Sequence, residues 1–490
     1  MRNRAQSLVG ICEIYWLAAV LEIPSVVPAA VSWRTFPRFR WKVAQTQVRG
    51  YEFSNGLFAH SGCFRIAPGQ LAIPTRRDRH NARATRCSPP PRILLGHGPE
   101  NTDPLPQRDQ LFNPDMMTKT DLASVAAPVT QRLLSLDALR GFDMFWIVGA
   151  EELVRGLQKI TASGPIGLVA EQLRHQPWAG FHFEDLIFPL FVFIVGVSLV
   201  FSLTKTLEQS GRRAAVVRIL RRSALLYVLG ILSYGGLSTP FEKIRLLGVL
   251  QRMALCYLFA SLLFCYLKPK ALVGVCVGLL LGYWALLSFV PVPGHGAGNF
   301  AEGANLANYV DAQYLPLRKW DGDHDPEGLL STLPAIASCL LGVFAGLLLK
   351  NPAVPDRKKV GWLIAAGLAG LAVGWLWHLN FPVIKKIWTS SFVLVAGGYS
   401  CLLLAAFYQI IDVWKFQKWA TPFVWIGVNP ITIYLGGHFI DFEAVAKLFV
   451  GGPVQAACGR YGELLLAVTT LAFGFLFLRF LYQRKIFLRV

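Results

Sequence analysis

A succession of long apolar runs, beginning at Leu134 and continuing almost to the C-terminus, constrains the fold of this chain most. A helix needs about 20 apolar residues to cross roughly 30 Å of hydrocarbon, and ten such runs can be distinguished. They lie at residues 136–156, 185–204, 220–237, 245–266, 270–290, 329–349, 360–379, 388–411, 420–440 and 461–482. The sequence therefore predicts an all-α bundle of about ten transmembrane helices, with eleven as the alternative count.

The composition narrows the class of protein further. Of the 490 residues, 54% are hydrophobic and only 16% are charged, against about 25% charged in a soluble domain. The net charge of +19 would ordinarily suggest a nucleic-acid partner, but the chain lacks the polar faces to present it. The nine cysteines form no CxxC pair and show no metal-ligand spacing. We therefore exclude a soluble enzyme, a disordered chain and a disulfide scaffold, and expect neither nucleic acid nor metal.

Basic residues orient the runs, because Lys and Arg collect in short cytoplasmic connections. Every alternate connection is basic, as is the C-terminal QRKIFLRV. These connections hold Lys205, Arg212, Arg213, Arg218, Arg221 and Arg222, then Lys268 and Lys270, then Lys350, Arg357, Lys358 and Lys359, and then Lys415 and Lys418. Both termini are thus predicted to be cytoplasmic. Only Lys385 and Lys386, in the connection 380–387, depart from the rule.

The first 115 residues differ from the rest, with 15 basic side chains, 14 of them Arg, against 8 acidic ones. They show neither helical nor strand periodicity. Two readings remain, a disordered basic extension or upstream DNA translated from a start codon set too early, and Met116-Met117 favours the second. We place no function in 1–115, treat 116–133 as a cytoplasmic lead-in, and assign 134–490 to the transmembrane domain.

Glycines recur at four-residue spacing inside three of the runs. Small residues at this spacing let helices approach closely in lipid, so they predict a tightly packed bundle. The pairs are Gly278 and Gly282, Gly342 and Gly346, and Gly370 and Gly374.

Ionisable side chains inside the runs are costly and usually face a cavity. Asp137 and Arg140 lie three residues apart, so a self-neutralising pair explains them equally well. Before the second run, a histidine near a carboxylate has the chemistry of a proton-transfer group near neutral pH. His175 and His182 are equal candidates on this reasoning, and Asp185 is the adjacent acid.

Further polar groups fall on the outward half of other runs. Arg252 would lie ~12 Å below the outer surface, so we expect it to meet an acid from another run. Asp325 and Glu327 stand at the mouth of the sixth run, where helix capping is the alternative explanation. Pro430 interrupts the ninth run. A polar cavity that opens outward explains these positions together, and its expected lining is Glu151, His175, Asp185, Arg252, Glu327, Asn429 and His438.

Six blocks of the chain follow those of a known family in order, and the resemblance covers about 130–485. The sequence resembles heparan-α-glucosaminide N-acetyltransferase and its bacterial relatives. The blocks are SLDALRGFDMFWIVG, HQPWAGFHFEDLIFPLFVFIVG, RLLGVLQRMALCYL, DPEGLLSTLPAIASCLLGVFAG, KKIWTSSFVLVAGGYSCLLLA and TPFVWIGVNPITIYLGGH.

The resemblance implies that acetyl-CoA binds from the cytoplasm and that its acetyl group passes to a glucosamine amine on the opposite side. It favours His175 over His182, because the family's active-site histidine precedes a Trp-x-Gly segment, here Trp178 to Gly180. Glu151 stands where the human-type enzymes carry Asn, which leaves the identity of the acceptor open. For a bacterial relative, the resemblance implies the inner (plasma) membrane.

The chemistry fits this topology, because a glucosamine ammonium must lose a proton before it can attack a thioester. His175 would be the general base or would itself carry the acetyl group, and Asp185 would orient it. Substrate contacts are predicted for Glu151, Arg252, Asp325, Glu327, Asn429 and His438. Contacts with the CoA phosphates are predicted for Arg212, Arg213, Arg218, Arg221 and Arg222, for which topogenic charge alone is the alternative explanation.

The sequence thus predicts a transmembrane acetyltransferase that acts on an amino sugar or another envelope glycan at the outer face. Its partners would be acetyl-CoA, the acceptor and the lipid bilayer, as a single chain or a homodimer. The alternatives are a secondary transporter or flippase of a sugar-like or anionic solute without acyl chemistry, and a structural membrane component.

Overall fold

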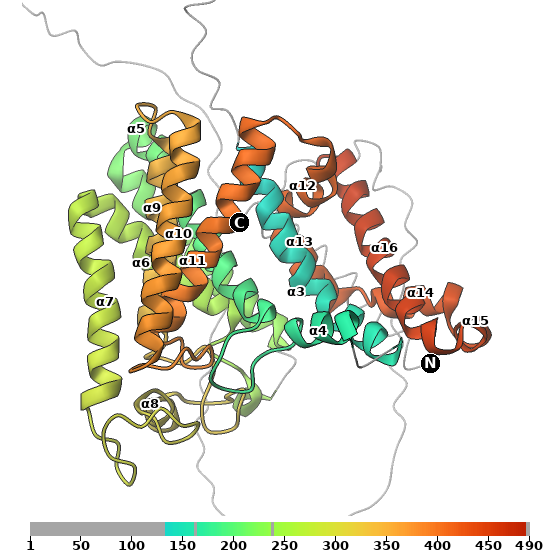
Figure 1. The fold of residues 1–490 in the computed structure, drawn as a ribbon, viewed down its shortest axis with the longest axis horizontal. Helices are drawn as coiled ribbons and strands as arrows, with labels where there is room; N and C mark the ends of the chain where they lie inside the picture. The colour runs from blue at the N-terminus through green and yellow to red at the C-terminus, as the bar shows by residue number, and fades with distance from the viewer. Residues whose placement is uncertain (1–132, 161–163, 237–239, 487–490) are drawn as a thin grey trace, which may run out of the picture. The chain divides into compact units, whose positions relative to one another are not determined.

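The computed structural model describes residues 133–160, 164–236 and 240–486, except for the side chains at positions 150, 151, 438 and 439. All regular secondary structure in these residues is helical, and two isolated β-bridges are the only strand-like pairings there (Figure 1). The predicted all-α class is therefore confirmed for this part of the chain. The expectations for 1–115 concern residues outside the described ranges.

Each predicted apolar run coincides with helical structure, and α5 contains two of the runs. The helices are α3 (Leu134–Ile160), α5 (Phe183–Ser233), α6 (Val249–Tyr266), α7 (Pro269–Phe289), α9 (Thr332–Lys350), α10 (Asp356–His378), α11 (Ser390–Phe407) continued by η4 (Tyr408–Val413), α12 (Thr421–Val428), α13 (Pro430–Phe439) and α16 (Gly462–Gln483).

Seven helical stretches among the described residues are long and apolar enough to cross a membrane. The number is below ten for local reasons. The helix α5 is counted once, although Gly211 breaks it with φ 76° and ψ 177°, a conformation open to glycine. The α12–α13 pair is interrupted at Asn429-Pro430, and α3 carries several charged residues.

The helix α5 lies at the centre of the bundle and packs against α3, α6, α9 and α11. Its contact with α9 is close because two glycines face each other. A Cβ at Gly196 would lie 2.0 Å from the carbonyl oxygen of Cys339, and one at Gly342 would lie 2.0 Å from that of Phe193. No side chain fits between the two backbones at this crossing.

A second close contact joins α3 to α12. A Cβ at Gly141 would lie 1.7 Å from the carbonyl oxygen of Phe423, and one at Gly427 would lie 1.8 Å from that of Asp137. The sequence did not single out this pair, because its members lie on different runs. By contrast, Gly278 and Gly282 on α7 face no other described atom within 4 Å, so their spacing marks no helix contact within the described part of the chain.

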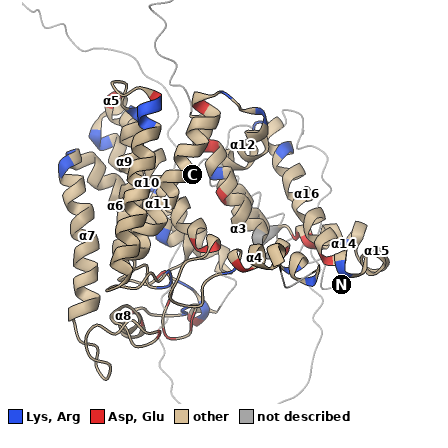
Figure 2. Ribbon diagram, viewed as in Figure 1, with Lys and Arg blue, Asp and Glu red and all other residues tan. Residues whose placement is uncertain are grey.

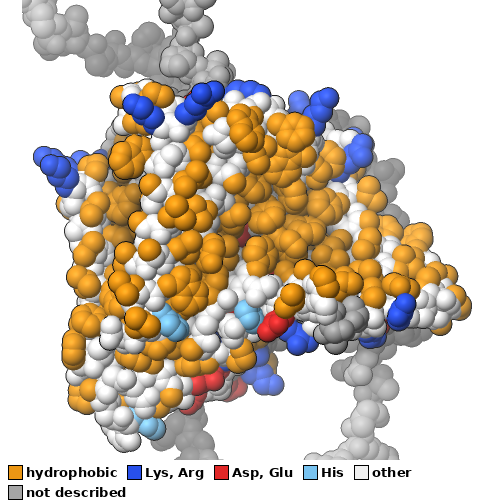
Figure 3. Space-filling model, in the orientation of Figure 1, with side chains coloured by type: hydrophobic (Ala, Val, Ile, Leu, Met, Phe, Trp, Pro, Cys, Tyr) orange, Lys and Arg blue, Asp and Glu red, His pale blue; other side chains and the backbone are white. Residues whose placement is uncertain are grey.

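Charged and apolar side chains separate along the helix axes. Lys and Arg gather at the end of the bundle where α5 breaks and α7 begins (Figure 2). A broad belt of hydrophobic side chains lies below them (Figure 3). The belt includes exposed residues on α7, α10 and α16, such as Leu281, Trp362 and Leu476. This pattern is the one expected of helices that face lipid.

At the opposite end of the bundle, long connections fold back over the helices. They contain the short helices α4 (Gly164–Gln172), α8 (Leu306–Tyr314), α14 (Phe442–Val450) and α15 (Pro453–Ala457). An apolar cluster ties the connection after α7 to the one before α11. It includes Tyr283, Leu287, Leu306, Phe381 and Ile384. The site described next lies among these connections.

Candidate active site

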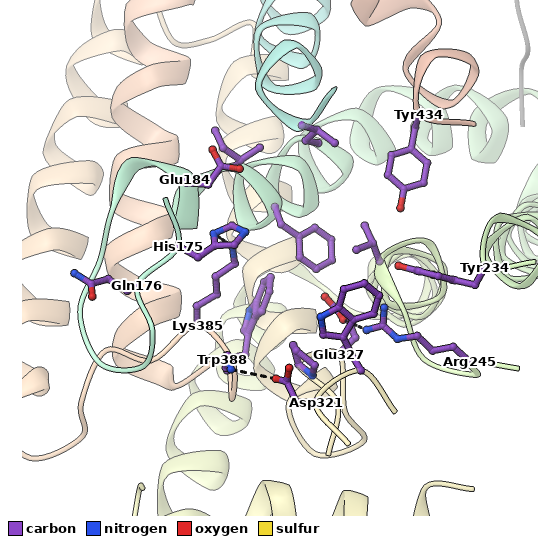
Figure 4. A pocket seen from close by; sticks show the side chains of 17 residues that line it. His175, Gln176, Glu184, Tyr234, Arg245, Asp321, Glu327, Lys385, Trp388 and Tyr434 are labelled. Carbon is purple, nitrogen blue, oxygen red and sulfur yellow. Dashed lines mark hydrogen bonds and ion pairs between the residues drawn. The ribbon is translucent and has the colours of Figure 1, made fainter. Parts of the chain in front are cut away.

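A cavity of about 370 Å³ opens at this end of the bundle (Figure 4). Its walls come from α3, the connection before α5, the start of α5, the connections before α6 and α9, the segment before α11, and α13. The polar and aromatic side chains that line it are His175, Gln176, Glu184, Phe188, Tyr234, Arg245, Trp320, Asp321, Glu327, Lys385, Lys386, Trp388 and Tyr434.

Three charged or ionisable groups meet at one wall of this cavity. Nδ1 of His175 lies 3.1 Å from Oδ1 of Asp185 and 3.0 Å from Nζ of Lys385. Nζ of Lys385 lies 3.4 Å from the same carboxylate oxygen. The Asp185 side chain is fully buried, whereas that of His175 is 60% exposed. The ring therefore pairs with a buried acid on one side and remains accessible on the other.

The first turn of α5 holds Asp185 in place. Its Oδ2 accepts hydrogen bonds from the backbone N–H groups of Gln176 and His182, at 3.2 and 3.0 Å. These bonds fold the connection 174–182 back over the start of the helix. The His182 ring has different partners from the His175 ring. Its Nδ1 lies 2.9 Å from the Arg174 carbonyl oxygen, and its Nε2 lies 2.7 Å from Gln176 Nε2. Of the two, only His175 lines the cavity.

The opposite wall contains a second ionic cluster. Nε and Nη2 of Arg245 donate to the two carboxylate oxygens of Asp325, at 2.8 and 2.6 Å, and Nη2 also donates to Glu327. The guanidinium lies between the rings of Tyr234 and Trp320, 4.9 Å from each centroid. Burial raises the pKa of Glu327 despite the nearby arginines. Arg245 and Glu327 line the cavity, and Asp325 lies behind them.

The turn that carries Glu327 rests on Asp311 of α8. The Asp311 carboxylate accepts a 2.8 Å hydrogen bond from the backbone N–H of Leu329, and a Cβ at Gly328 would lie 1.9 Å from its Oδ2. Burial raises the pKa of Asp311 to about 6, although the backbone donors oppose this shift. The residue is only 2% exposed.

Arg252 does not have the partner that we expected. It is fully buried on α6, and it forms no ion pair with a described residue. It donates to the hydroxyl of Ser331 and, at 3.4 Å, to the Gly328 carbonyl, and it lies 4.9 Å from the Trp388 ring centroid. A cation–π contact thus replaces the expected acid. Arg252 lies behind Trp388, which forms the cavity wall.

Another predicted substrate residue, Asn429, does not line this cavity. Asn429 is buried at the α12–α13 break, where its Nδ2 donates to the carbonyl of Ile486 at 3.1 Å. Its neighbours Val428 and Pro430 line a different cavity. The expectation that Asn429 shares the outer cavity is therefore not supported. The side chains of Glu151 and His438 lie outside the described residues.

That different cavity, of about 300 Å³, contains Arg140, Arg218 and Arg222. Arg222 lies over the ring of Tyr257, and Arg218 donates to Thr206 Oγ1 at 2.8 Å. Of the predicted phosphate-binding residues, Arg212, Arg213 and Arg221 line no described cavity, and Arg212 packs on Tyr266.

A narrow space of about 20 Å³ lies between the two larger cavities. It shares Phe188, Val249 and Tyr434 with the cavity of His175. It shares Phe191, Met253 and Pro430 with the arginine-lined cavity. Along α5, Phe188 lines the cavity of His175 and Ser198 lines the arginine-lined cavity, and about 15 Å of helical rise separates them. The three spaces therefore form a row through the bundle.

Sequence reasoning missed Lys385 and the aromatic walls. One signal was present, because Lys385 and Lys386 were the only basic pair that departed from the charge rule. Tyr234, Trp320, Trp388 and Tyr434 were indistinguishable from ordinary apolar residues of the runs and connections. These four side chains come from four segments that are far apart in the sequence.

The fold and site define a multi-pass membrane protein with a histidine–carboxylate pair on a polar cavity. The family described as heparan-alpha-glucosaminide N-acetyltransferase, catalytic, matches residues 132–379, and the chain belongs to this family. The protein named heparan-alpha-glucosaminide N-acetyltransferase from Homo sapiens is 29% identical over 326 residues, which cover 55% of this chain and 49% of that protein. Its counterpart from Mus musculus is 28% identical over 327 residues, with the same coverage.

The chain spans about half the length of these curated relatives. The matched family segment includes His175, Asp185, Arg245 and Glu327, and it ends before Lys385. The predicted family resemblance is therefore confirmed.

Proposed function

We propose that this protein is a transmembrane acetyltransferase that moves an acetyl group from cytoplasmic acetyl-CoA to an amino sugar or envelope glycan on the outer side. The observation that carries the proposal is the row of three cavities, with the His175–Asp185 pair at one end and arginines at the other. The relatives' printed name, heparan-alpha-glucosaminide N-acetyltransferase, supports the same reaction class.

The proposed topology has ten spans, both termini in the cytoplasm, and a location in the bacterial inner membrane. Two arguments support it. All ten apolar runs coincide with helices, and the charge rule assigns the break at Gly211 to the cytoplasmic side. On this topology the arginine-lined cavity opens toward the cytoplasm, and the cavity of His175 opens outward.

On the donor side, Arg218 and Arg222 would bind phosphates of CoA, because guanidinium groups suit bidentate phosphate contacts. Arg140 would support this wall, since it already bonds to Ser198 at 2.6 Å and to the Gly427 carbonyl at 3.1 Å. The acyl end of the donor would extend through the narrow space toward His175. No metal is assigned to this chemistry.

On the acceptor side, the carboxylates of Glu184, Asp321 and Glu327 line the cavity, where Asp321 pairs with Lys386 and Glu327 with Arg245. These carboxylates would accept hydrogen bonds from the amine and hydroxyl groups of an amino sugar. The aromatic rings of Trp320 and Trp388 provide flat apolar surfaces beside them. His175 would remove the amine's proton, or would carry the acetyl group in a two-step transfer, while Asp185 orients the ring. The geometry is compatible with both routes.

A row of cavities is also what a transporter of a sugar-like solute would contain. The experiment that separates the two functions uses purified protein in proteoliposomes, with labelled acetyl-CoA and glucosamine as the acceptor. Acetylation supports the enzyme, whereas uptake of unmodified glucosamine supports the transporter.

In the same assay, His175→Ala should lower acetyl transfer by about 100-fold or more, because it removes the general base. His182→Ala is the matched control, since this histidine comes from the same connection but does not line the cavity. It should retain most of the activity. Absence of transfer by the wild type, or full activity of His175→Ala, would contradict the proposed mechanism.

A further inference from the structure

The segment 380–391 presents Lys385 to His175 with little freedom. Ile384 pairs with Ala179 in an isolated β-bridge, and the Gly180 N–H donates to the Val383 carbonyl at 2.9 Å. Two hydrogen bonds close the turn, from Trp388 N–H to the Lys385 carbonyl at 2.9 Å and from Thr389 N–H to the Ile384 carbonyl at 3.1 Å.

The next residue, Lys386, anchors the same turn to the connection before α9. Its ammonium bonds to Glu302 at 2.7 Å and to Asp321 at 3.2 Å. These carboxylates compensate the charge of Lys386, whereas Lys385 lies beside His175 (Figure 4) and 3.4 Å from Asp185. Two adjacent lysines therefore have different environments.

The contacts of Lys385 restrict which nitrogen atoms of Lys385 and His175 can carry a proton. A 3.0 Å contact between Nζ of Lys385 and Nδ1 of His175 requires one donor and one acceptor. If Lys385 is an ammonium ion, Nδ1 must be unprotonated and Nε2 carries the ring proton. If Lys385 is a neutral amine, Nδ1 can donate to it and to Asp185, which leaves the lone pair of Nε2 available.

The second state is the one that a general base needs. We propose that Lys385 is a positioning residue that accepts the Nδ1 proton of His175, so that the imidazole relays the acceptor amine's proton from Nε2 to Lys385. The proposal rests on the proposed role of His175 as general base. It concerns a residue beyond the matched family segment.

The transfer balances without any further reactant. An N–H bond of the acceptor amine breaks as its proton bonds to Nε2 of His175, while the bond between Nδ1 and its proton breaks and that proton bonds to Nζ of Lys385. The ring ends neutral, Lys385 ends as an ammonium ion, and Asp185 stays ionised. The Lys385 side chain is 20% exposed, so it can release the proton to water.

The charges around Lys385 are compatible with a neutral starting state. Burial lowers its pKa, against the attraction of Asp185, Glu184 and Glu327. These three carboxylates and His175 are the titratable groups that face Lys385 from α5, the connection before α9 and the connection 174–182. Arg245 and Lys386 also line this cavity and add positive charge.

Two substitutions separate proton acceptance from charge. Lys385→Met removes the charge and the acceptor, and leaves His175 with Asp185 alone. Lys385→Arg keeps the charge but remains protonated, so it would donate permanently to Nδ1 and hold the proton on Nε2. We expect acetyl transfer to fall about tenfold in Lys385→Met and about 100-fold in Lys385→Arg, within the range of general-base effects. Lys386→Met measures the effect of weakening the turn itself, because Lys386 bonds to Glu302 and Asp321 rather than to His175.

The order of the two variants decides the question. A role in charge alone predicts that Lys385→Arg is at least as active as Lys385→Met, and this outcome overturns the proposal. A relay also moves two protons in one step. A plot of the wild-type rate against the D₂O fraction of the solvent should therefore be curved. For Lys385→Met the line should be straight. Equal linear dependence in both proteins also overturns the proposal.

A measurement without substrate distinguishes failure of this proposal from failure of the proposed function. Diethylpyrocarbonate reacts with a ring nitrogen that has a free lone pair, and mass spectrometry of peptides quantifies the product at His175. In both proteins the modification of His175 should increase with pH. In the wild type this increase should occur at higher pH than in Lys385→Met, because Lys385 must first lose its proton. Coincident pH profiles overturn the relay, whether or not the protein transfers acetyl groups.

Discussion

At the scale of single residues, the few charges in the apolar part of the chain fall into distinct environments. Arg245 pairs with two carboxylates and packs between two aromatic rings, whereas Arg252 forms no ion pair with a described residue and instead contacts a hydroxyl, a carbonyl and the Trp388 ring. His175 lies in an intermediate position, paired to a buried acid but exposed to the cavity. Burial and pairing therefore separate structural charges from the group with access to a substrate.

Asp311 should make the stability of the protein depend on pH. Its pKa is about 6 in the folded state, against about 3.9 in an unfolded chain, so the folded state binds this proton more tightly. The resulting stabilisation is fully present below about pH 4 and is lost as the pH rises through about 6. The two-unit difference corresponds to about 3 kcal/mol at most.

Asp311→Asn should remove this dependence, because an amide does not titrate. We expect the melting temperature of the wild type to rise relative to that of Asp311→Asn when the pH is lowered from 7.5 to 5. Differential scanning fluorimetry in detergent measures it. Parallel pH profiles for the two proteins would show that Asp311 does not titrate in this way.

At the scale of helices, the same sequence pattern has two different structural meanings. Gly342 and Gly346 face α5 at distances that leave no room for a side chain, whereas Gly278 and Gly282 face open space. The helix α7 is largely exposed, so its glycines are on the side that would meet lipid or another molecule. A spacing of four residues describes one face of a helix but not what lies opposite that face.

Gly342→Ala and Gly278→Ala test this difference with the same chemical change. A Cβ at position 342 would collide with backbone, so we expect destabilisation by about 1–3 kcal/mol, typical of overpacking. At position 278 we expect a change within about 0.5 kcal/mol. Thermal unfolding in detergent measures both, and equal destabilisation would refute the assignment of the α5–α9 contact.

At the scale of the whole molecule, the charge rule and the helix positions lead to a testable topology. Cys458 is exposed, and it lies in the connection 441–460 that the ten-span arrangement places outside. The connection around Arg213 should face the cytoplasm. The two positions therefore report on opposite sides of the membrane.

A membrane-impermeant maleimide should label Cys458 in intact spheroplasts. It should label Arg213→Cys, made in a Cys458→Ser background, only after the membrane is opened, because the reagent cannot cross it. Peptide mass spectrometry identifies the labelled position. Labelling of position 213 in intact spheroplasts would require a different number of spans.

Much of the fold could be predicted from the sequence. All ten apolar runs coincide with helices, and the break between the second and third runs falls at Gly211. Part of the site was also predicted, because His175, Asp185 and Glu327 come together at one end of the bundle. The contacts of Arg252, Asn429 and Lys385 could not be inferred from their neighbours in the chain.

The sequence by itself determined the class of protein, the helices and the charge pattern, because hydrocarbon thickness and loop charge act on each segment separately. Only the tertiary structure decided which side chains form the walls of the cavity and which lysine meets His175. These contacts join segments that are distant in the chain, and each depends on how the helices cross and how the connecting turns fold. A pattern along one segment carries no information about the side chain that packs against it from another.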